Sequence, residues 1–166
     1  MNPRRIALVF AALVLFITGI QQSASAATEL FAGATVPVRE FSFDRKMGPF
    51  VGCQYTYDVI SMVGVGAMGA YHRLSPPAHL VNYSNLVEAL AIAKIHPPVG
   101  VFLQGGVGVI YSSIGFKGRG ESKTDFTSAG GLGVSFMQIE ITALYHSVWE
   151  GGGSRAFVTA SVGTSF

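Results

Sequence analysis

A histidine, a serine and a glutamate lie close together near the end of the chain, at His146, Ser147 and Glu150. These residue types can form a hydrolytic triad, in which a base activates a hydroxyl and a carboxylate orients the base. The surrounding tract alternates apolar and polar residues, which indicates a β-strand, and adjacent strand residues face opposite sides. His146 and Ser147 are therefore expected to point apart. His146 stays a candidate base in an alternative interpretation, and an interior polar residue in the main one.

Two other patterns could in principle hold a cofactor. His72 and His146 are both expected on the inner side of their strands, but two histidines without a third ligand more often line an interior than bind a metal. The glycine-rich stretch "GGVGVIYSSIG" resembles a nucleotide loop in spacing only, because no helix follows it. We therefore expect neither a metal nor another cofactor.

The elements that must position these residues are short alternating tracts separated by turns of two kinds. Short connections such as "YDVI", "HPP" and "SFMQ" alternate along the chain with long ones such as "SSIGFKGRGESKTD". Barrels of bacterial outer membranes have short turns at one end and longer loops at the other. The pattern predicts an all-β fold, an eight-stranded antiparallel transmembrane β-barrel in up-and-down order. A soluble barrel of the lipocalin kind, with its apolar face inward, is the rival interpretation. The tracts lie near residues 29–36, 49–57, 60–72, 85–96, 99–111, 126–135, 137–146 and 156–166.

Charged residues fix which face of the strands looks inward. A charge that faces lipid is costly, so the apolar face of each strand is expected outside. This assignment gives an interior polar network of Glu88, Lys94, Gln104 and Glu140 that plugs the lumen. Lys94 is expected to pair with Glu140, because both lie near the short turns. Glu88 is six residues from Lys94 on the same strand, about 20 Å away, which is too far.

The first 26 residues have the composition of a cleavable signal peptide. Arg4 and Arg5 precede an apolar run that ends before the small-residue site Ala24-Ser25-Ala26. The run is short for a retained membrane helix, which needs about 20 residues. We expect a signal peptide at 1–26 and one barrel domain at 27–166.

The composition of the predicted mature chain excludes several function classes. Without Arg4 and Arg5 the formal charge falls from +2 to zero, so we do not expect the protein to bind nucleic acid. The single cysteine, Cys53, permits no intramolecular disulfide.

The stretches "PPVGVFLQGGVGVIYSS", "TSAGGLGVSFMQIEITALYHS" and "FVTASVGTSF" resemble the C-terminal half of small OmpA-type and opacity-type outer-membrane barrels. The resemblance implies a non-enzymatic envelope-structural or surface-interaction role in the outer membrane of a Gram-negative bacterium, and a monomer. It also implies that the terminal Phe166 is recognised by the barrel assembly machinery. A weaker resemblance to the lipid A deacylase barrels implies a catalytic histidine at His146. That family has a His-x-Ser pattern, which this chain lacks, so any such esterase would be degenerate or inactive.

Basic residues gather in or beside the long connections. Arginine and lysine pair well with phosphate, so these residues could contact lipopolysaccharide, and a solvated loop surface is the equal alternative. They are Arg39, Arg45, Lys46, Arg73, Lys117, Arg119 and Lys123.

Overall fold

The structure is a computed structural model that describes residues 26–38, 46–60, 62–75, 81–97, 100–116, 119–150 and 153–166. At positions 81–83, 116, 119, 150 and 153 it describes the backbone alone. The predicted signal peptide lies outside the described residues, except for Ala26.

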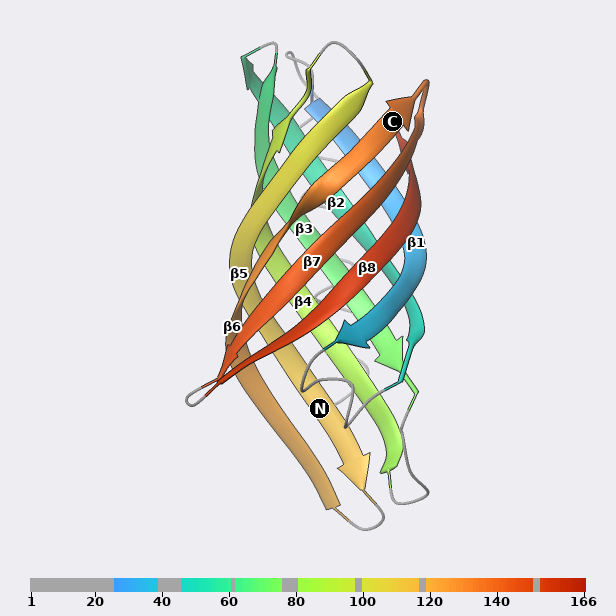
Figure 1. Cartoon of the computed structure of the whole chain (residues 1–166), viewed down its shortest axis with the longest axis vertical. Coiled ribbons are helices and arrows are strands. Elements are labelled where there is room, and N and C mark those ends of the chain that lie inside the picture. The colour runs from blue at the N-terminus through green and yellow to red at the C-terminus, as the bar shows by residue number, and fades with distance from the viewer. Residues whose placement is uncertain are drawn as a thin grey trace.

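Eight antiparallel strands form one closed sheet, in which each strand pairs with its neighbours in sequence (Figure 1). The last strand closes the barrel on the first, in a ladder that runs from Glu29 opposite Ser165 to Val38 opposite Ala156. The predicted eight-stranded, up-and-down antiparallel barrel is confirmed. The strands are β1 (Ala26–Val38), β2 (Gly48–Ile60), β3 (Val63–Leu74), β4 (Val81–Ile95), β5 (Val101–Phe116), β6 (Arg119–Phe136), β7 (Ile139–Glu150) and β8 (Gly153–Ser165).

Side chains along each strand alternate between the lumen and the outer surface. The charged residues of β4, Glu88 and Lys94, are buried, whereas Val87 and Ile95 are exposed on the outside. On β3 the side chain of His72 is buried in the lumen, which leaves Tyr71 on the outer face. The predicted facing of both strands is therefore confirmed.

The outer surface is apolar, the reverse of a water-soluble protein. Large aliphatic side chains stand on it around the whole barrel, with exposed fractions of 50% or more at many positions. Cys53 shares this face, because it pairs with the outward Leu30, but its neighbours leave it only 6% exposed. The band includes Leu30, Val51, Leu103, Val107, Leu132, Ile141 and Val162.

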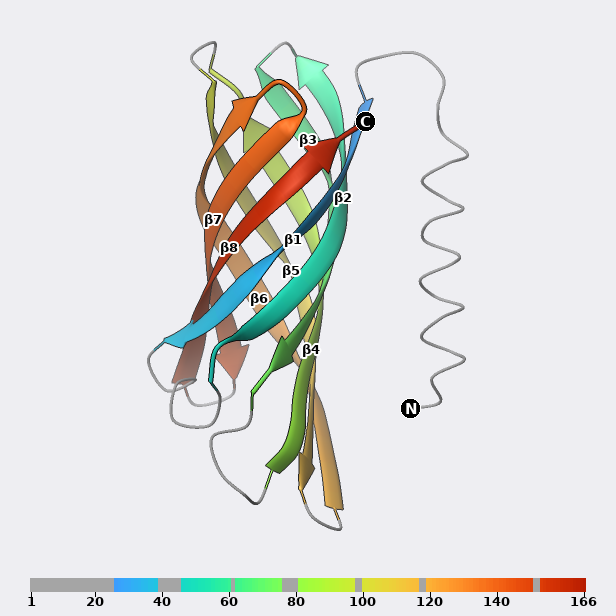
Figure 2. The ribbon, with the colours of Figure 1, turned by 90° about the vertical axis from the view of Figure 1, so that its right-hand side faces the viewer.

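The two ends of the barrel differ. The turn end carries the connections at 61–62, 96–100 and 137–138. The opposite end, which we call the extended end, is where β4, β5 and β6 project beyond the other strands (Figure 2).

The predicted long connections at the extended end need a correction, because much of their length is sheet. The expected loop 112–125 is mostly a hairpin, since β5 continues to Phe116 and β6 begins at Arg119. Likewise, only 151–152 separate β7 from β8. Backbone pairing does not require apolar side chains, so the ladders continue after the apolar alternation that marked the predicted strand ends has stopped. Short and long connections therefore do not alternate regularly.

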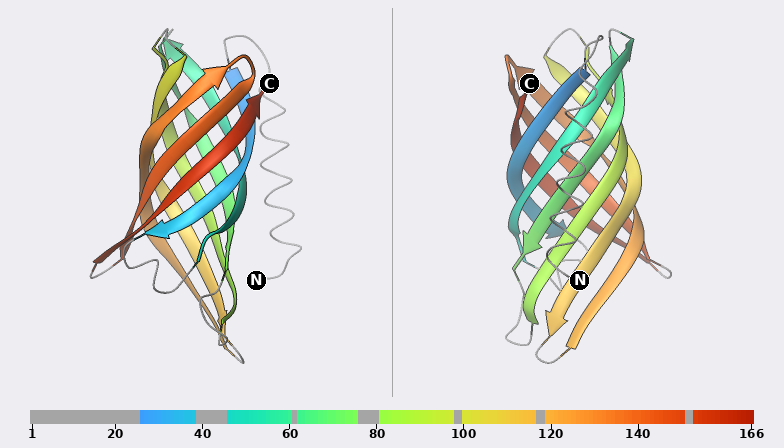
Figure 3. Two further views of the ribbon diagram at one scale, coloured as in Figure 1. Left: turned by 45° about the vertical axis from the view of Figure 1, so that its right-hand side comes forward. Right: turned by 180° about the vertical axis from the view of Figure 1, so that it is seen from behind.

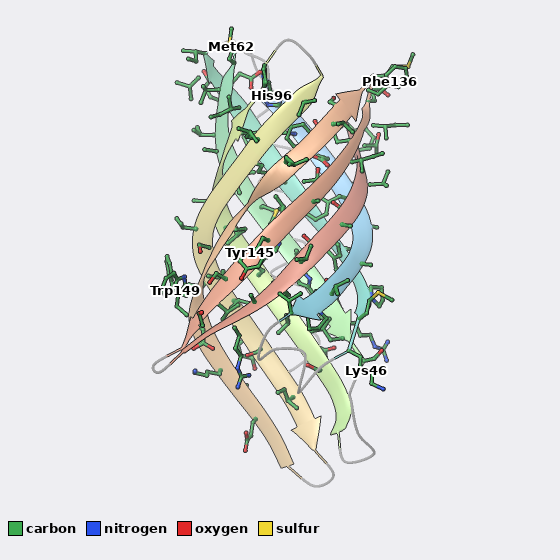
Figure 4. All side chains as sticks on the ribbon, viewed as in Figure 1. Lys46, Met62, His96, Phe136, Tyr145 and Trp149 are labelled. Carbon is green, nitrogen blue, oxygen red and sulfur yellow. The ribbon has the colours of Figure 1, made fainter. Side chains whose placement is uncertain are left out.

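Aromatic side chains stand on the outer surface towards both ends (Figure 4). Trp149 pairs with Phe126 towards the extended end, and the two are 57% and 52% exposed. Phe136 and Phe166 are each 70% exposed at the turn end. The Phe166 amide donates to the Thr28 carbonyl at 2.9 Å, so the last residue is part of the sheet.

Glycines let large rings lie inside the narrow barrel. The Phe31 ring lies against Gly52, and the Phe102 ring against Gly133, so closely that a β-carbon at either glycine would collide with the ring. Among the described residues, none belongs to a helix long and apolar enough to cross a membrane.

Candidate functional site: the barrel lumen

Polar side chains from all eight strands converge in the lumen. Each comes from the inward face of its strand, so the alternation of the sheet alone brings them together. They are at most 7% exposed: Glu29, Thr35, Gln54, Thr56, His72, Ser84, Glu88, Lys94, Gln104, Thr127, Glu140, Thr142, His146 and Thr159.

A first group, the Lys94 cluster, lies towards the turn end and consists of Glu29, Gln54, Lys94, Gln104 and Glu140. Lys94 Nζ donates to the Glu140 carboxylate and lies 3.9 Å from Glu29 Oε2. Gln54 donates to Glu29 and accepts a hydrogen bond from Gln104 Nε2 at 3.1 Å. The sequence predicted the pairing of Lys94 with Glu140, and the structure brings the two together.

Two further contacts hold Lys94 and Glu29 in place. The Lys94 ammonium lies 4.0 Å from the centroid of the Phe102 ring, a cation–π geometry. The Glu29 carboxylate lies directly over Gly163 of β8, where a β-carbon would collide with it. The cluster therefore combines two carboxylates with one ammonium in the narrow lumen.

A second group, the Glu88 cluster, lies nearer the extended end and consists of Thr35, His72, Glu88, Thr127, His146 and Thr159. Glu88 Oε1 accepts from Thr127 Oγ1 at 3.2 Å and lies 3.0 Å from His146 Nδ1. The other nitrogen of that ring, Nε2, lies 3.0 Å from Thr159 Oγ1. Glu88 is therefore the common partner of groups from β6 and β7.

His72 occupies the other side of Glu88. Its Nε2 atom lies 3.8 Å from Glu88 Oε2, and its Nδ1 atom lies 2.8 Å from Thr35 Oγ1. Each imidazole also stacks on a phenylalanine: His72 on Phe50 with centroids 5.0 Å apart, and His146 on Phe157 at 4.4 Å. The carboxylate is thus held between two histidines whose rings are fixed by packing.

The two clusters meet at a small cavity with room for about one water molecule. Residues of both clusters line it, together with apolar side chains that include Phe31, Met68 and Leu144. A second apolar group covers the Glu88 cluster towards the extended end: Leu74, Leu86, Ile110, Val148 and Phe157. Polar layers therefore alternate with apolar layers along the lumen.

Thr159, His146 and Glu88 follow the hydroxyl–imidazole–carboxylate order of a hydrolytic triad. All three side chains are at most 3% exposed, and the cavity beside them is far too small for an acyl chain. The three groups are therefore enclosed away from any lipid substrate.

The residues of the alternative hydrolytic interpretation do not meet. His146 points into the lumen, whereas Ser147 lies on the opposite face of β7, opposite Ser128 of β6. The backbone of Glu150 ends β7, and its side chain is not among those described. Among the described residues, no three His, Cys, Asp or Glu side chains are arranged to hold a metal ion.

His96 lies at the turn end, just after β4. Its ring lies 5.9 Å from the Phe102 ring, centroid to centroid. Burial, followed by the nearby Lys94 ammonium, lowers the pKa of His96 below its usual value. Both effects disfavour the charged form of the imidazole.

The predicted basic residues are only partly in loops. Arg73 is exposed on β3, and Lys123 is exposed on β6 with its Nζ atom 2.9 Å from Asp125 Oδ1. Lys46 is exposed beside β2 and forms a bridge with Ser75. Arg119 is in β6, with only its backbone described, which corrects its predicted loop position. Arg39, Arg45 and Lys117 lie outside the described residues.

Three solved barrels resemble this one in fold. Ail, the attachment invasion locus protein of Yersinia pestis, superposes with a TM-score of 0.64 at 18% identity, over 87% of this chain and 100% of that one. The N-terminal barrel domain of Pseudomonas aeruginosa OprF gives 0.59 at 16% identity, over 87% and 100%. Neisserial surface protein A superposes with a TM-score of 0.56 at 14% sequence identity, over 87% of this chain and 98% of that one.

This chain has the fold of the small outer-membrane barrels. No family model and no curated protein matches its sequence. The likeness therefore concerns the fold of the small barrels, and their individual activities do not follow from it.

Sequence reasoning missed two parts of the lumen. Glu29 was not assigned to the Lys94 cluster, because the first tract has apolar residues on both faces and its facing is ambiguous by itself. The joint contact of His72 and His146 with Glu88 was also missed. The sequence indicates that both histidines face inward near the extended end. That information does not specify which carboxylate the two histidines share.

Proposed function

We propose that this protein is a non-enzymatic barrel of the bacterial outer membrane, exported by a signal peptide at residues 1–26. The observation that carries the proposal is the inverted distribution of its side chains. Charged groups such as Glu88, Lys94 and Glu140 are buried inside, and an apolar band surrounds the outside. Such a wall is stable against hydrocarbon, where a closed barrel leaves no backbone group unpaired. The turn end then faces the periplasm.

The lumen serves as a structural plug in this proposal. Two polar clusters and the apolar layers between them fill an interior that, in an eight-stranded barrel, is only wide enough for side chains. Purified protein in a planar lipid bilayer should show no steady conductance. A large, stable open level from the intact protein would contradict the plug while leaving the membrane location untouched.

The function itself is exerted at the extended end, where polar strand extensions stand beyond the apolar band. Lys46, Arg73 and Lys123 are exposed there, and the basic residues 39, 45, 117 and 119 adjoin them in sequence. We propose that they contact lipopolysaccharide phosphates. Ail, a barrel of the same fold, has been solved in complex with the heparin analogue sucrose octasulfate, which shows that such a fold can present an anion-binding surface.

A binding experiment tests the contact with lipopolysaccharide. The double variant Lys46→Ala/Arg73→Ala should bind vesicles that contain lipopolysaccharide more weakly than the parent, and dephosphorylated lipopolysaccharide should remove the difference. Thr124→Ala, an uncharged change at an exposed position on β6, is the matched control. Equal binding by the double variant and the control would refute phosphate recognition by these two residues.

Phe166 has a role in assembly in this proposal. Its backbone hydrogen bonds to Thr28 do not depend on the ring, which is 70% exposed. Phe166→Ala should therefore refold in detergent as well as the parent but reach the outer membrane of cells in lower yield. We propose further that the protein is a monomer within one membrane, a proposal supported by β1 and β8 closing the sheet within a single copy.

A further inference from the structure

The extension of β6 leaves an open sheet edge. Residues 119–125 pair with β5 on one side, from Phe116 opposite Arg119 to Ile110 opposite Asp125. The ladder with β7 starts only at Phe126, so in the described part of the chain the other side of this segment has no strand partner. Figure 3 shows the extension as a continuation of the barrel wall. An open edge presents backbone donors and acceptors to any extended segment that matches it.

The sequence of this edge, "RGESKTD", is complementary to itself in the antiparallel direction. With a two-fold axis at Ser122, Glu121 of one copy stands opposite Lys123 of the other. The same register places position 119, an arginine, opposite position 125, an aspartate. Glu121 and Lys123 share one face of the strand, since they are two residues apart. Opposite charges in directly paired positions stabilise a sheet, and like charges destabilise it.

Neighbouring registers lack this complementarity. Moving the axis to Lys123 places Lys123 opposite itself and Glu121 opposite Asp125, so both pairs carry like charges. Moving it to Glu121 places Glu121 opposite itself and position 119 opposite Lys123, again like with like. Charged edges normally prevent strand pairing, whereas the register about Ser122 places every charge of this segment opposite a charge of the other sign.

We propose that the β6 edge at residues 119–125 is a docking surface for the same edge of a second copy of this chain. The two edges pair antiparallel about Ser122 and form a continuous sheet through β5 and β6 of both copies. Gly120 to Thr124 are exposed and accessible for this pairing. Lys123 contacts Asp125 within its own chain, and its side chain is still 53% exposed.

Antiparallel pairing also fixes the orientation of the two barrels. The axis is perpendicular to the sheet, so it reverses the strand direction and points the partner barrel the opposite way. If the protein lies in the outer membrane as proposed above, the copies belong to two facing membranes. The contact is then one of homotypic adhesion, in which many weak pairs act together. The edge pairing itself does not depend on the membrane location.

Disulfide trapping in detergent tests the pairing without relying on the membrane. In a Cys53→Ser background, Ser122→Cys places two cysteines across the axis at about 4.5–5.5 Å between Cα atoms, within disulfide range. Ser113→Cys is the matched control, because Ser113 lies opposite Ser122 on β5, and two copies of it would be about 14 Å apart. Mild oxidation should link Ser122→Cys into dimers and leave Ser113→Cys monomeric. Equal linking of both, or none of either, would overturn the proposal.

A charge swap tests the register. Adding Lys123→Glu to the trapping variant places a glutamate at position 123 of each copy opposite Glu121 of the other. The repulsion in these two pairs should slow dimer formation about tenfold. The further change Glu121→Lys restores opposite charges and should bring the rate back to near the starting value. Heat-modified migration in gels confirms that each barrel is folded. Failure of the double swap to restore linking would refute the register.

Mixing two vesicle populations tests the orientation. Each population carries differently tagged Ser122→Cys protein with its extended end outside. Linked dimers that contain both tags show pairing between facing membranes. Dimers formed only within one population would refute this arrangement and leave the detergent result as a separate finding.

Discussion

Lys94 of β4 and Glu140 of β7 form an ion pair across the lumen, although two strands separate them on one side of the sheet and four on the other. Glu29 of β1 approaches the same ammonium at 3.9 Å. One cation therefore balances two acids, which makes the three residues unequal in their contributions to stability.

Removal of the Lys94 ammonium should lower the free energy of unfolding more than removal of the Glu140 carboxylate. Lys94→Met leaves Glu29 and Glu140 together without a counterion, and breaking a buried pair typically costs about 3–5 kcal/mol. Glu140→Gln should cost less, because Glu29 still pairs with Lys94. Urea unfolding measures the free energy of unfolding of each variant. The decrease in the double variant should be smaller than the sum of the decreases in the two single variants. Additive losses would show that the two side chains do not interact.

The loss of unfolding free energy caused by Lys94→Met should be smaller in acid, because protonation removes the negative charges of Glu29 and Glu140, which repel each other in this variant. Unfolding free energies at about pH 4 and pH 8 test this. Lys123→Met, at an exposed site, is the control and should show little difference between the two conditions. A loss in Lys94→Met that is independent of pH would point to lost packing on Phe102 instead.

Glu88→Gln should destabilise the barrel most at acidic pH. The neutral amide replaces the only carboxylate between His72 and His146 in the described lumen, so an imidazolium formed there would have no counterion. In acid the unfolded chain protonates its histidines freely, which draws the equilibrium towards unfolding. Denaturation of parent and variant between about pH 5 and pH 8 measures the effect, since the usual histidine pKa lies between these values. An equal difference across this range would refute the role of Glu88 as counterion.

Gly163→Ala should disturb the Lys94 cluster through Glu29. The added methyl group would meet the Glu29 carboxylate, and overpacking of this kind costs about 1–3 kcal/mol. Gly130→Ala on β6 is the control, because its new methyl group meets nothing within 4 Å. Thermal or urea unfolding should separate the two variants, and similar stabilities would show that Glu29 moves away freely.

No hydrolysis of lipid A is expected from this barrel. His146 is enclosed with Glu88 and Thr159, and Ser147 faces away from it. Mass spectrometry of lipid A incubated with the purified protein should show all acyl chains intact. Acyl release that is lost in His146→Ala would contradict this and support the esterase interpretation.

The sequence predicted the barrel and the facing of its charges because both follow from a two-residue alternation. The pairing of Lys94 with Glu140 followed from facing and from their common nearness to the turn end. The same signal could not give the strand ends at 112–125, since backbone ladders continue through polar residues. Nor could it reveal the shared contacts of Glu88, which depend on how eight strands are staggered around the lumen. Those relations are set by closure of the sheet, and only three-dimensional structure shows them.

The central claim is that the apolar wall faces lipid, and the fluorescence of Trp149, the only tryptophan of the chain, tests it most directly. Its side chain is on the outer wall, 57% exposed, beside Phe126 towards the extended end (Figure 4). In vesicles of brominated lipids, bromines near the headgroups should quench it strongly and bromines at the chain ends less, as befits an interfacial tryptophan. Aqueous acrylamide should quench it weakly. Strong quenching by acrylamide with no effect of any brominated lipid would contradict the account.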